Sequence, residues 1–267
     1  MKIQILIILA LLGSLPQAWA ESRLDEKIDD VIEVIADMKQ MPDGNIPPAL
    51  LRRARAVVIV PNMFKVGVLV GGSRGEGILS VRNATGWTAP VFITLTGGSL
   101  GLQAGVERSD LVLVFTNDDS VKNITRGKFT LGADASVATG PVGRHGKAMT
   151  DKNFDAAVYS YSRTKGIFAG LSLAGSVLKI DHKANASYYA TAGLTAQSIL
   201  DDRLSVIPAG VPALRSALPN LGQPAAARSP ATPATAATPV PASDAPGQVR
   251  TYAFGDRPAE AGSDEEQ

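Results

Sequence analysis

Cysteine is absent from the 267-residue sequence, and histidine occurs only twice, at His145 and His182. The absence of cysteine excludes disulfide bonds, a thiolate nucleophile and thiolate-bound zinc or iron–sulfur sites. The two histidines are far apart, neither lies in a metal-ligand spacing, and no pair of acidic residues marks an acid–base centre. We therefore expect a non-enzymatic protein with no catalytic residue, no metal site and no cofactor.

Reactive groups are also missing from residues 86–105, "GWTAPVFITLTGGSLGLQAG", which contain no ionised side chain. The stretch is rich in glycine and in alternating apolar residues, a pattern typical of β-strands. We interpret it as a β scaffold that holds something apolar, with the functional charge elsewhere in the chain.

The chain has little net charge, +1 in total, but its charges are unevenly placed. Residues 21–51 hold three basic and eight acidic residues, and residues 191–267 hold five and eight. Residues 52–190 hold seventeen basic and nine acidic residues, a net charge of +8. A basic middle segment indicates an anionic partner for that part of the chain, although a basic surface can also serve solubility alone.

Long apolar runs are scarce, and the one at the N-terminus, residues 3–12, is shorter than the roughly 20 residues that span a bilayer. Lys2 precedes this run, Pro16 follows it, and Ala18 and Ala20 are small residues around a cleavage point. This pattern is typical of a secretory signal peptide over residues 1–20. We expect a periplasmic or secreted protein that begins near Glu21 and is soluble or peripheral on a membrane.

Helical signals flank the central part of the chain. Apolar residues recur at helical spacing over residues 22–39, and the polar face of this N-terminal amphipathic helix is mainly acidic, which favours packing on the domain over docking on anionic lipid. Residues 46–56 predict a second short helix with Pro48 in its first turn. Three further short helices are expected within residues 118–129, 195–201 and 212–218.

Short apolar or alternating runs separated by glycine predict many strands in the middle of the chain. These are residues 56–61, 65–72, 76–82, 91–96, 99–106, 110–116, 131–140, 156–162, 166–175 and 176–181. Gly97 and Gly98 are interpreted as a hairpin turn. The fold class is therefore α+β, with a mainly antiparallel, glycine-rich β-sandwich or barrel-like core, an N-terminal amphipathic helix and short C-terminal helices. Residues 220–267 are rich in Ala and Pro and predict a disordered tail.

Five stretches together resemble the SYLF family of domains, which occurs in yeast actin-patch proteins, animal phosphoinositide-binding proteins and secreted bacterial proteins. They are "RARAVVIVP" (53–61), "GGSRGEGILSVR" (71–82), "GWTAPVFITLTGGSLGLQAG" (86–105), "LGADASVATGPVGR" (131–144) and "YSYSRTKGIFAGLSLAGSVL" (159–178). The resemblance implies a glycine-rich, largely β domain that binds phospholipid. It also implies actin binding in some eukaryotic members.

From this resemblance we expect residues 21–219 to form a lipid-binding domain. Its partner would be an anionic phospholipid or membrane surface, with basic residues contacting phosphate and an apolar groove or sheet edge contacting the acyl chain. No nucleic acid is expected, and actin is not expected in an exported protein. The alternative is an envelope scaffold that binds another protein through the β domain.

Candidate binding residues are mostly basic. The loop "GPVGRHGK" (140–147) has glycines that let backbone N–H groups face an anion, although it could equally be a flexible basic turn. Trp87 fits either a membrane interface or the end of a barrel core. The predicted lipid-binding residues are Arg52, Arg53, Arg55, Lys65, Arg74, Trp87, Arg144, His145, Lys147, Arg163 and Lys165.

Overall fold

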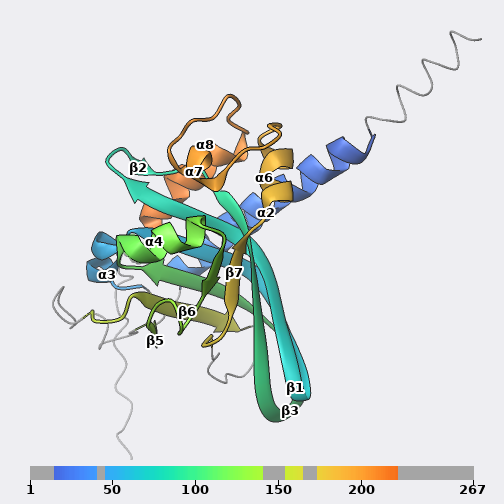
Figure 1. Ribbon diagram of the computed structural model, residues 1–267, viewed down its shortest axis with the longest axis vertical. Coiled ribbons are helices and arrows are strands. Elements are labelled where there is room, and N and C mark those ends of the chain that lie inside the picture. Colours follow the sequence, from blue (N-terminus) through green and yellow to red (C-terminus); the bar gives the residue numbers. More distant parts are fainter. Residues whose placement is uncertain (1–14, 41–45, 141–153, 165–172, 222–267) are drawn as a thin grey trace, which may run out of the picture. The chain divides into compact units, whose positions relative to one another are not determined.

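Two very long strands, β1 (Ala56–Asn83) and β3 (Val91–Phe115), organise the fold (Figure 1). The computed structural model describes residues 15–40, 46–140, 154–164 and 173–221. β1 and β3 pair antiparallel from Ala56 opposite Phe115 to Leu79 opposite Val91, with register shifts after Val60 and Gly67. We call this pair of strands the ribbon. Figure 1 shows the ribbon running out from the helices and bending back at its far end.

The ribbon folds over itself at two glycines. A Cβ atom placed on Gly77 would lie 2.8 Å from the Cα of Val60, and one on Gly75 would lie 3.0 Å from the Cγ of Met63. The second half of β1 therefore crosses directly over its first half. Because glycine has no side chain, the two layers can approach closely at this crossing. One ribbon thereby supplies strands to both layers.

Five short strands extend the ribbon. They are β2 (Gly86–Trp87), β4 (Lys128–Thr130), β5 (Val137–Thr139), β6 (Val158–Thr164) and β7 (Val177–Ile180). β6 pairs antiparallel with the last part of β3 and parallel with β5. β7 pairs antiparallel with the first part of β3 and with β4. β2 pairs with the end of β1. The sheet is mostly antiparallel and curls into a half-barrel, which confirms the predicted α+β, barrel-like class.

Helices pack on this sheet and on one another. They are α2 (Leu15–Gln40), α3 (Pro48–Arg53), α4 (Asp118–Thr125), α6 (His182–Tyr188), α7 (Ala196–Leu200) and α8 (Gly210–Ala217), followed by the 3-10 turn η2 (Leu218–Asn220). α2 contacts β1, α6 and α8. Over the described residues, no helix has both the length and the hydropathy to cross a bilayer.

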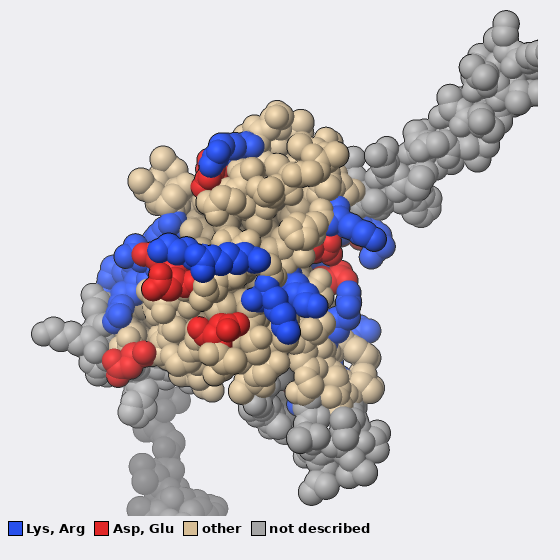
Figure 2. Space-filling view, viewed as in Figure 1, with Lys and Arg blue, Asp and Glu red and all other residues tan. Residues whose placement is uncertain are grey.

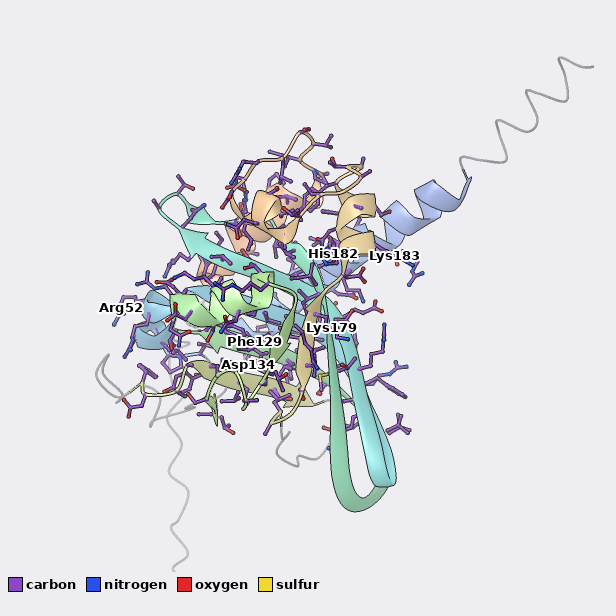
Figure 3. The ribbon with its side chains drawn as sticks, viewed as in Figure 1. Arg52, Phe129, Asp134, Lys179, His182 and Lys183 are labelled. Carbon is purple, nitrogen blue, oxygen red and sulfur yellow. The ribbon has the colours of Figure 1, made fainter. Side chains whose placement is uncertain are left out.

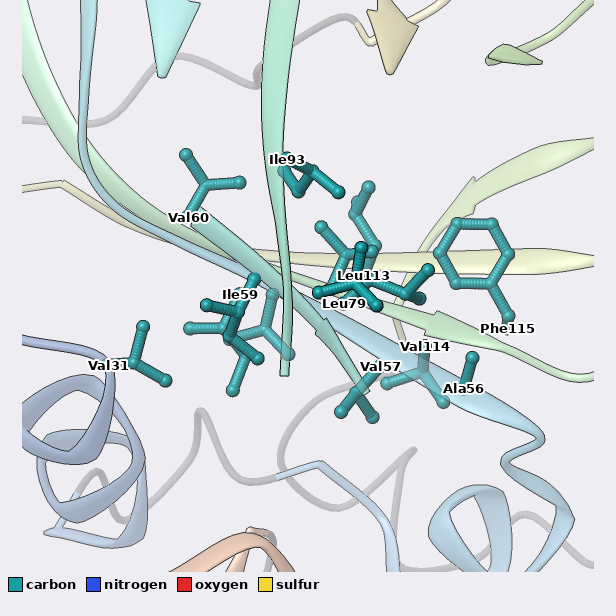
Figure 4. Close-up of a cluster of buried hydrophobic side chains, with 14 of the residues drawn as sticks. Val31, Ala56, Val57, Ile59, Val60, Leu79, Ile93, Leu113, Val114 and Phe115 are labelled. Carbon is teal, nitrogen blue, oxygen red and sulfur yellow. The ribbon is translucent and has the colours of Figure 1, made fainter. Parts of the chain in front are cut away.

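The apolar stripe of α2 lies against the buried side of the ribbon. Ile28, Val31, Ile35 and Met38 are buried, whereas Glu33 is exposed. Figure 4 shows side chains from α2, β1 and β3 gathered in one buried cluster. The predicted packing of one helical stripe on the domain is therefore confirmed.

The sheet departs from the sequence prediction at its turns. Gly97 and Gly98 form no hairpin, because they continue β3 opposite Ser73 and Gly72. The reversal between β1 and β3 falls instead near Gly86, whose φ of +131° suits a glycine. A Cβ on Gly97 would lie 2.8 Å from the Ser73 Oγ and would also overlap the Ser176 hydroxyl. This glycine therefore leaves room for the two serine hydroxyls and does not form a turn. Three predicted strands between residues 56 and 82 are likewise one strand.

Some predicted segments lie outside the described residues, namely most of the strand at 166–175 and the tail from residue 222. Leu221, which precedes the undescribed part of the tail, is buried in the core. The boundary between domain and tail therefore stays a prediction.

Two buried tyrosines predict a loss of stability in alkali. Burial raises the pKa of Tyr161 and of Tyr189 well above the usual value, and the nearby phenols of Tyr159 and Tyr188 raise them further. The Tyr189 hydroxyl donates a hydrogen bond to the carbonyl of Pro90 at 2.6 Å. Since each folded-state pKa exceeds the unfolded value of about 10, the free energy of unfolding falls as pH rises above about 10.

Urea unfolding between pH 7 and pH 11 measures this effect in wild-type protein and in Tyr189→Phe. We expect the variant to lose about 1 kcal/mol at pH 7, where it lacks one buried hydrogen bond. It should also lose less stability than wild type between pH 9.5 and 11. An alkaline loss of the same size in both proteins would contradict this account.

Candidate functional site

A cleft of about 410 Å³ opens where β7 meets α6 and the ribbon. Figure 3 shows Lys179 on β7 and His182 and Lys183 at the start of α6, on the same side of the molecule. The cleft is lined by Arg74, Thr94, Thr96, Lys179, Ile180, Asp181, His182 and Lys183. We call it the basic cleft.

Strand pairing aligns charged residues in a row across the cleft. Glu76 of β1 lies opposite Thr94 of β3, Thr94 lies opposite Lys179 of β7, and Lys179 lies opposite Lys128 of β4. Two lysines therefore occupy one cross-strand pair. Like charges directly opposite each other in a sheet are destabilising, so this arrangement costs the fold stability.

One buried amide fixes α6 at the edge of the cleft. The Oδ1 of Asn185 accepts a hydrogen bond from the Phe92 N–H at 2.8 Å, and its Nδ2 donates to the carbonyls of Phe92 and Asp181 at 3.1 and 2.7 Å. The Asp181 carboxylate caps the helix by accepting from the Ala184 N–H at 2.9 Å. These contacts hold the first turn of α6, with His182, beside the end of β7.

The cleft carries an excess of positive charge. Arg74 and Lys27 both reach Glu76, at 3.6 and 3.7 Å. In the part of the chain that the structure describes, no ion pair involves Lys128, Lys179 or Lys183. Figure 2 shows a group of lysine and arginine side chains on this face, with acidic side chains at its margins. Such a surface attracts anionic groups.

The structure scatters most of the predicted basic residues. Arg52 and Arg53 end α3, and Arg55 follows them and pairs with Asp118 at 3.5 Å. Lys65 lies on the ribbon opposite Glu107, and Arg163 on β6 pairs with Asp37 of α2. The guanidinium of Arg53 lies 5.9 Å from the centre of the Phe154 ring.

Among the predicted residues that the structure describes, only Arg74 lines the basic cleft. Arg144, His145, Lys147 and Lys165 lie outside the described residues, so the predicted glycine-rich loop stays a prediction.

Trp87 belongs to the packed end of the sheet. Its side chain is 7% exposed, and the guanidinium of Arg82 lies 5.2 Å from the ring centre. Of the two interpretations of this residue, the structure supports the barrel-end core. Its Nε1 is buried and has no hydrogen-bond partner among the described residues.

Sequence reasoning missed four residues of the cleft region, Lys128, Lys179, His182 and Lys183. One signal was available, because Asp181 before "HKAN" is a good helix cap and alternation along residues 177–180 turns Lys179 outward. β4 and β7 become neighbours only through long-range strand pairing, which no local sequence pattern specifies.

Ser73 and Ser99 each stand in a G-x-S-x-G string, the sequence form of a nucleophile elbow. Both lie within strands rather than on a strand-to-helix turn, and the Ser73 hydroxyl donates to the carbonyl of Gly97 at 3.4 Å. The strings are therefore structural. Among the described residues, no cluster of His, Asp and Glu could hold a metal ion.

Comparison with known proteins identifies relatives of this chain. A family model described as "Ysc84: Las17-binding protein actin regulator" matches residues 96–221. Protein YSC84 of Saccharomyces cerevisiae is 36% identical over 177 residues, which cover 65% of this chain and 37% of that protein. SH3 domain-containing YSC84-like protein 1 of Xenopus laevis is 34% identical over 183 residues, covering 68% of this chain and 54% of that protein. The chain thus spans between about two fifths and about half the length of these relatives.

These comparisons correct the expected partner. LAS seventeen-binding protein 3 of S. cerevisiae, 37% identical over 65% of this chain and 38% of that protein, is named for binding another protein. The names point to protein or actin-regulatory partners. The prediction of an anionic phospholipid or membrane surface is therefore wrong. The expectation that actin is not a partner is withdrawn as well. The resemblance to the SYLF family is confirmed, and the chain carries a domain of the Ysc84/SYLF family.

Proposed function

We propose that this domain is a non-enzymatic protein-binding module that holds a partner protein on its β-rich surface. The names of its relatives, which include binding proteins and an actin regulator, support a protein partner. The signal-peptide pattern in residues 1–20 supports export. The partner is then a protein of the cell envelope, and the domain acts as a scaffold there.

An exposed apolar patch on the ribbon carries this proposal. Phe64, Val66 and Val106 are 39%, 41% and 68% exposed. Val66 lies opposite Val106, and Phe64 lies opposite Arg108, whose guanidinium is 6.0 Å from the Phe64 ring centre. Alternation along each strand and pairing across them place these four side chains on one face. We call this set the ribbon patch.

The composition of the ribbon patch is that of an interface centre. Aromatic residues and arginine are enriched in protein interfaces, and exposed apolar patches on folded proteins mark interaction sites. Burying a valine or phenylalanine fully contributes roughly 1.5–3 kcal/mol. A partner that covers the patch with apolar side chains, and that places a carboxylate by Arg108, would recover this energy.

Capture of a partner from membrane-free envelope extract by the tagged full chain tests the proposal. We expect saturable binding of a protein with no lipid co-purifying. The double variant Val66→Lys, Val106→Glu should weaken binding about tenfold or more, because it removes the apolar pair yet leaves an attractive cross-strand pair in the ribbon.

The matched control exchanges the neighbouring pair, Lys65→Glu with Glu107→Lys, whose side chains point to the other face of the ribbon. Its binding should stay within about twofold of wild type. Wild-type protein that captures no protein saturably, or a patch variant that binds as tightly as wild type while its circular dichroism is native, would refute the proposal.

A further inference from the structure

The basic cleft shares no residue with the ribbon patch, and its positive charges outnumber its negative charges. Lys179 and Lys128 are directly opposite each other on β7 and β4, and Lys183 and Arg74 line the cleft together with Lys179. Both carboxylates at this site already have partners, since Asp181 caps α6 and Glu76 lies between Arg74 and Lys27. The described residues thus leave two lysines of the cleft lining, Lys179 and Lys183, without an ion-pair partner, and a third, Lys128, beside Lys179 on the next strand.

The spacing of these cations follows from the sheet. Lys179 on β7 and Lys128 on β4 are directly opposite each other, whereas Arg74 on β1 is opposite Thr96, two residues along the strand from the row that contains Thr94 and Lys179. Neighbouring strands are about 4.8 Å apart, so this cationic set is roughly 14 Å long across the strands. A single carboxylate or phosphate is too small to contact all of it. A chain that carries several negative charges matches its length.

The chemistry of the lining favours a peptide among such chains. Acidic residues at alternate positions of an extended peptide are roughly 6.6 Å apart, so three of them span about 13 Å, which is close to the length of the cationic set. Thr94 and Thr96 lie on β3, the strand between Arg74 and Lys179. The Thr94 hydroxyl can bond to a peptide backbone, and the Thr96 hydroxyl, which donates to the Val177 carbonyl at 3.5 Å, can accept from a peptide N–H. Among the lining residues that the structure describes there is no Phe, Tyr or Trp on which the bases of a single-stranded nucleic acid would stack.

We infer that the basic cleft binds an extended acidic peptide segment, with carboxylates contacting Lys128, Lys179, Lys183 and Arg74. This inference rests on the proposed protein-binding function and names the chemistry of one partner segment. Binding an anionic chain removes the repulsion between Lys128 and Lys179, and part of the affinity comes from this relief. Charge pairs of this kind raise the association rate and lose strength in salt.

The test uses the full chain and a fluorescein-labelled peptide of six Glu-Ser repeats, with fluorescence anisotropy at low and moderate salt. We expect saturable binding that weakens as salt rises and that is absent for a Gln-Ser peptide of equal length. The variant Lys179→Glu, Lys183→Glu should weaken binding about tenfold or more.

The matched control is Lys122→Glu, Arg126→Glu, which changes the net charge equally at two exposed cations in and just after α4. Its affinity should stay within about twofold of wild type. Equal losses in both variants, no binding by wild-type protein, or tighter binding of a single-stranded oligonucleotide than of the peptide would each overturn the inference. Failure of the proposed function would show separately, as loss of wild-type partner capture.

Discussion

Replacing Gly77 with alanine is expected to destabilise the domain by about 3 kcal/mol or more, because the added methyl group meets backbone. The new Cβ would overlap the carbonyl oxygen of Ile59 and would lie 2.8 Å from the Cα of Val60. Backbone atoms in a paired strand cannot move aside as a side chain can. The two layers of the ribbon must therefore separate, and the buried Ile78 and Leu79 lose packing with them.

Urea unfolding followed by circular dichroism measures this effect, and Gly72→Ala is the matched control on the same strand. A Cβ on Gly72 would have one described atom within 4 Å, the Gly97 carbonyl oxygen at 3.9 Å, which is an ordinary contact. The control should change the free energy of unfolding by less than about 1 kcal/mol, in either direction. Similar unfolding midpoints for the two variants would show that the crossing at Gly77 is not closely packed.

The crossing also matters for function. It places Arg74 and Glu76, which flank Gly75, at the basic cleft, while Phe64 and Val66 stay exposed on the first half of β1. A single strand therefore carries residues of both candidate binding surfaces. Loosening the crossing would alter the two surfaces together, which offers one physical reason for a ribbon instead of separate hairpins.

The sequence predicted the type of most elements but not how they connect. Alternation at residues 91–96 and the proline at the first turn of α3 are local signals, and both indicated the right structure. The glycines at 97–98 fit a turn equally well by composition. Gly97 is needed instead because Ser73 and Ser176 lie over it, and those contacts are long range, whereas a Cβ on Gly98 would have no described atom within 4 Å.

Sequence patterns predicted a site residue only where the residue type and its immediate neighbours were informative. Arg74 was identified because it is basic and lies between strand-forming runs. Lys179 and Lys128, 51 positions apart in the chain, become a pair only when β4 joins β7. A basic middle segment is equally compatible with anionic lipid and with acidic protein. Charge alone therefore could not identify the class of partner, and the relatives of the chain were needed to correct it.

Asn185→Leu should cost the domain about 3 kcal/mol and also weaken binding at the basic cleft. Asn185 is 1% exposed, and its side chain supplies the hydrogen-bond partner of the Phe92 N–H. Leucine has similar volume but no polar atom, so that N–H would be left buried without a partner. The Phe92 carbonyl keeps its bond from the Asp181 N–H at 2.9 Å, so the loss falls mainly on the donor side.

The functional consequence follows from the position of α6. Asn185 ties this helix to the strand that lines the cleft, and the same helix carries His182 and Lys183. In the folded fraction of Asn185→Leu at low temperature, affinity for the Glu-Ser peptide should therefore fall, whereas capture through the ribbon patch should not.

Asn123→Leu, at a part-exposed position on α4, is the control and should leave stability within about 0.5 kcal/mol of wild type. Wild-type stability in Asn185→Leu would mean that the amide does not anchor α6. Peptide affinity unchanged in its folded fraction would mean that α6 does not position the cleft.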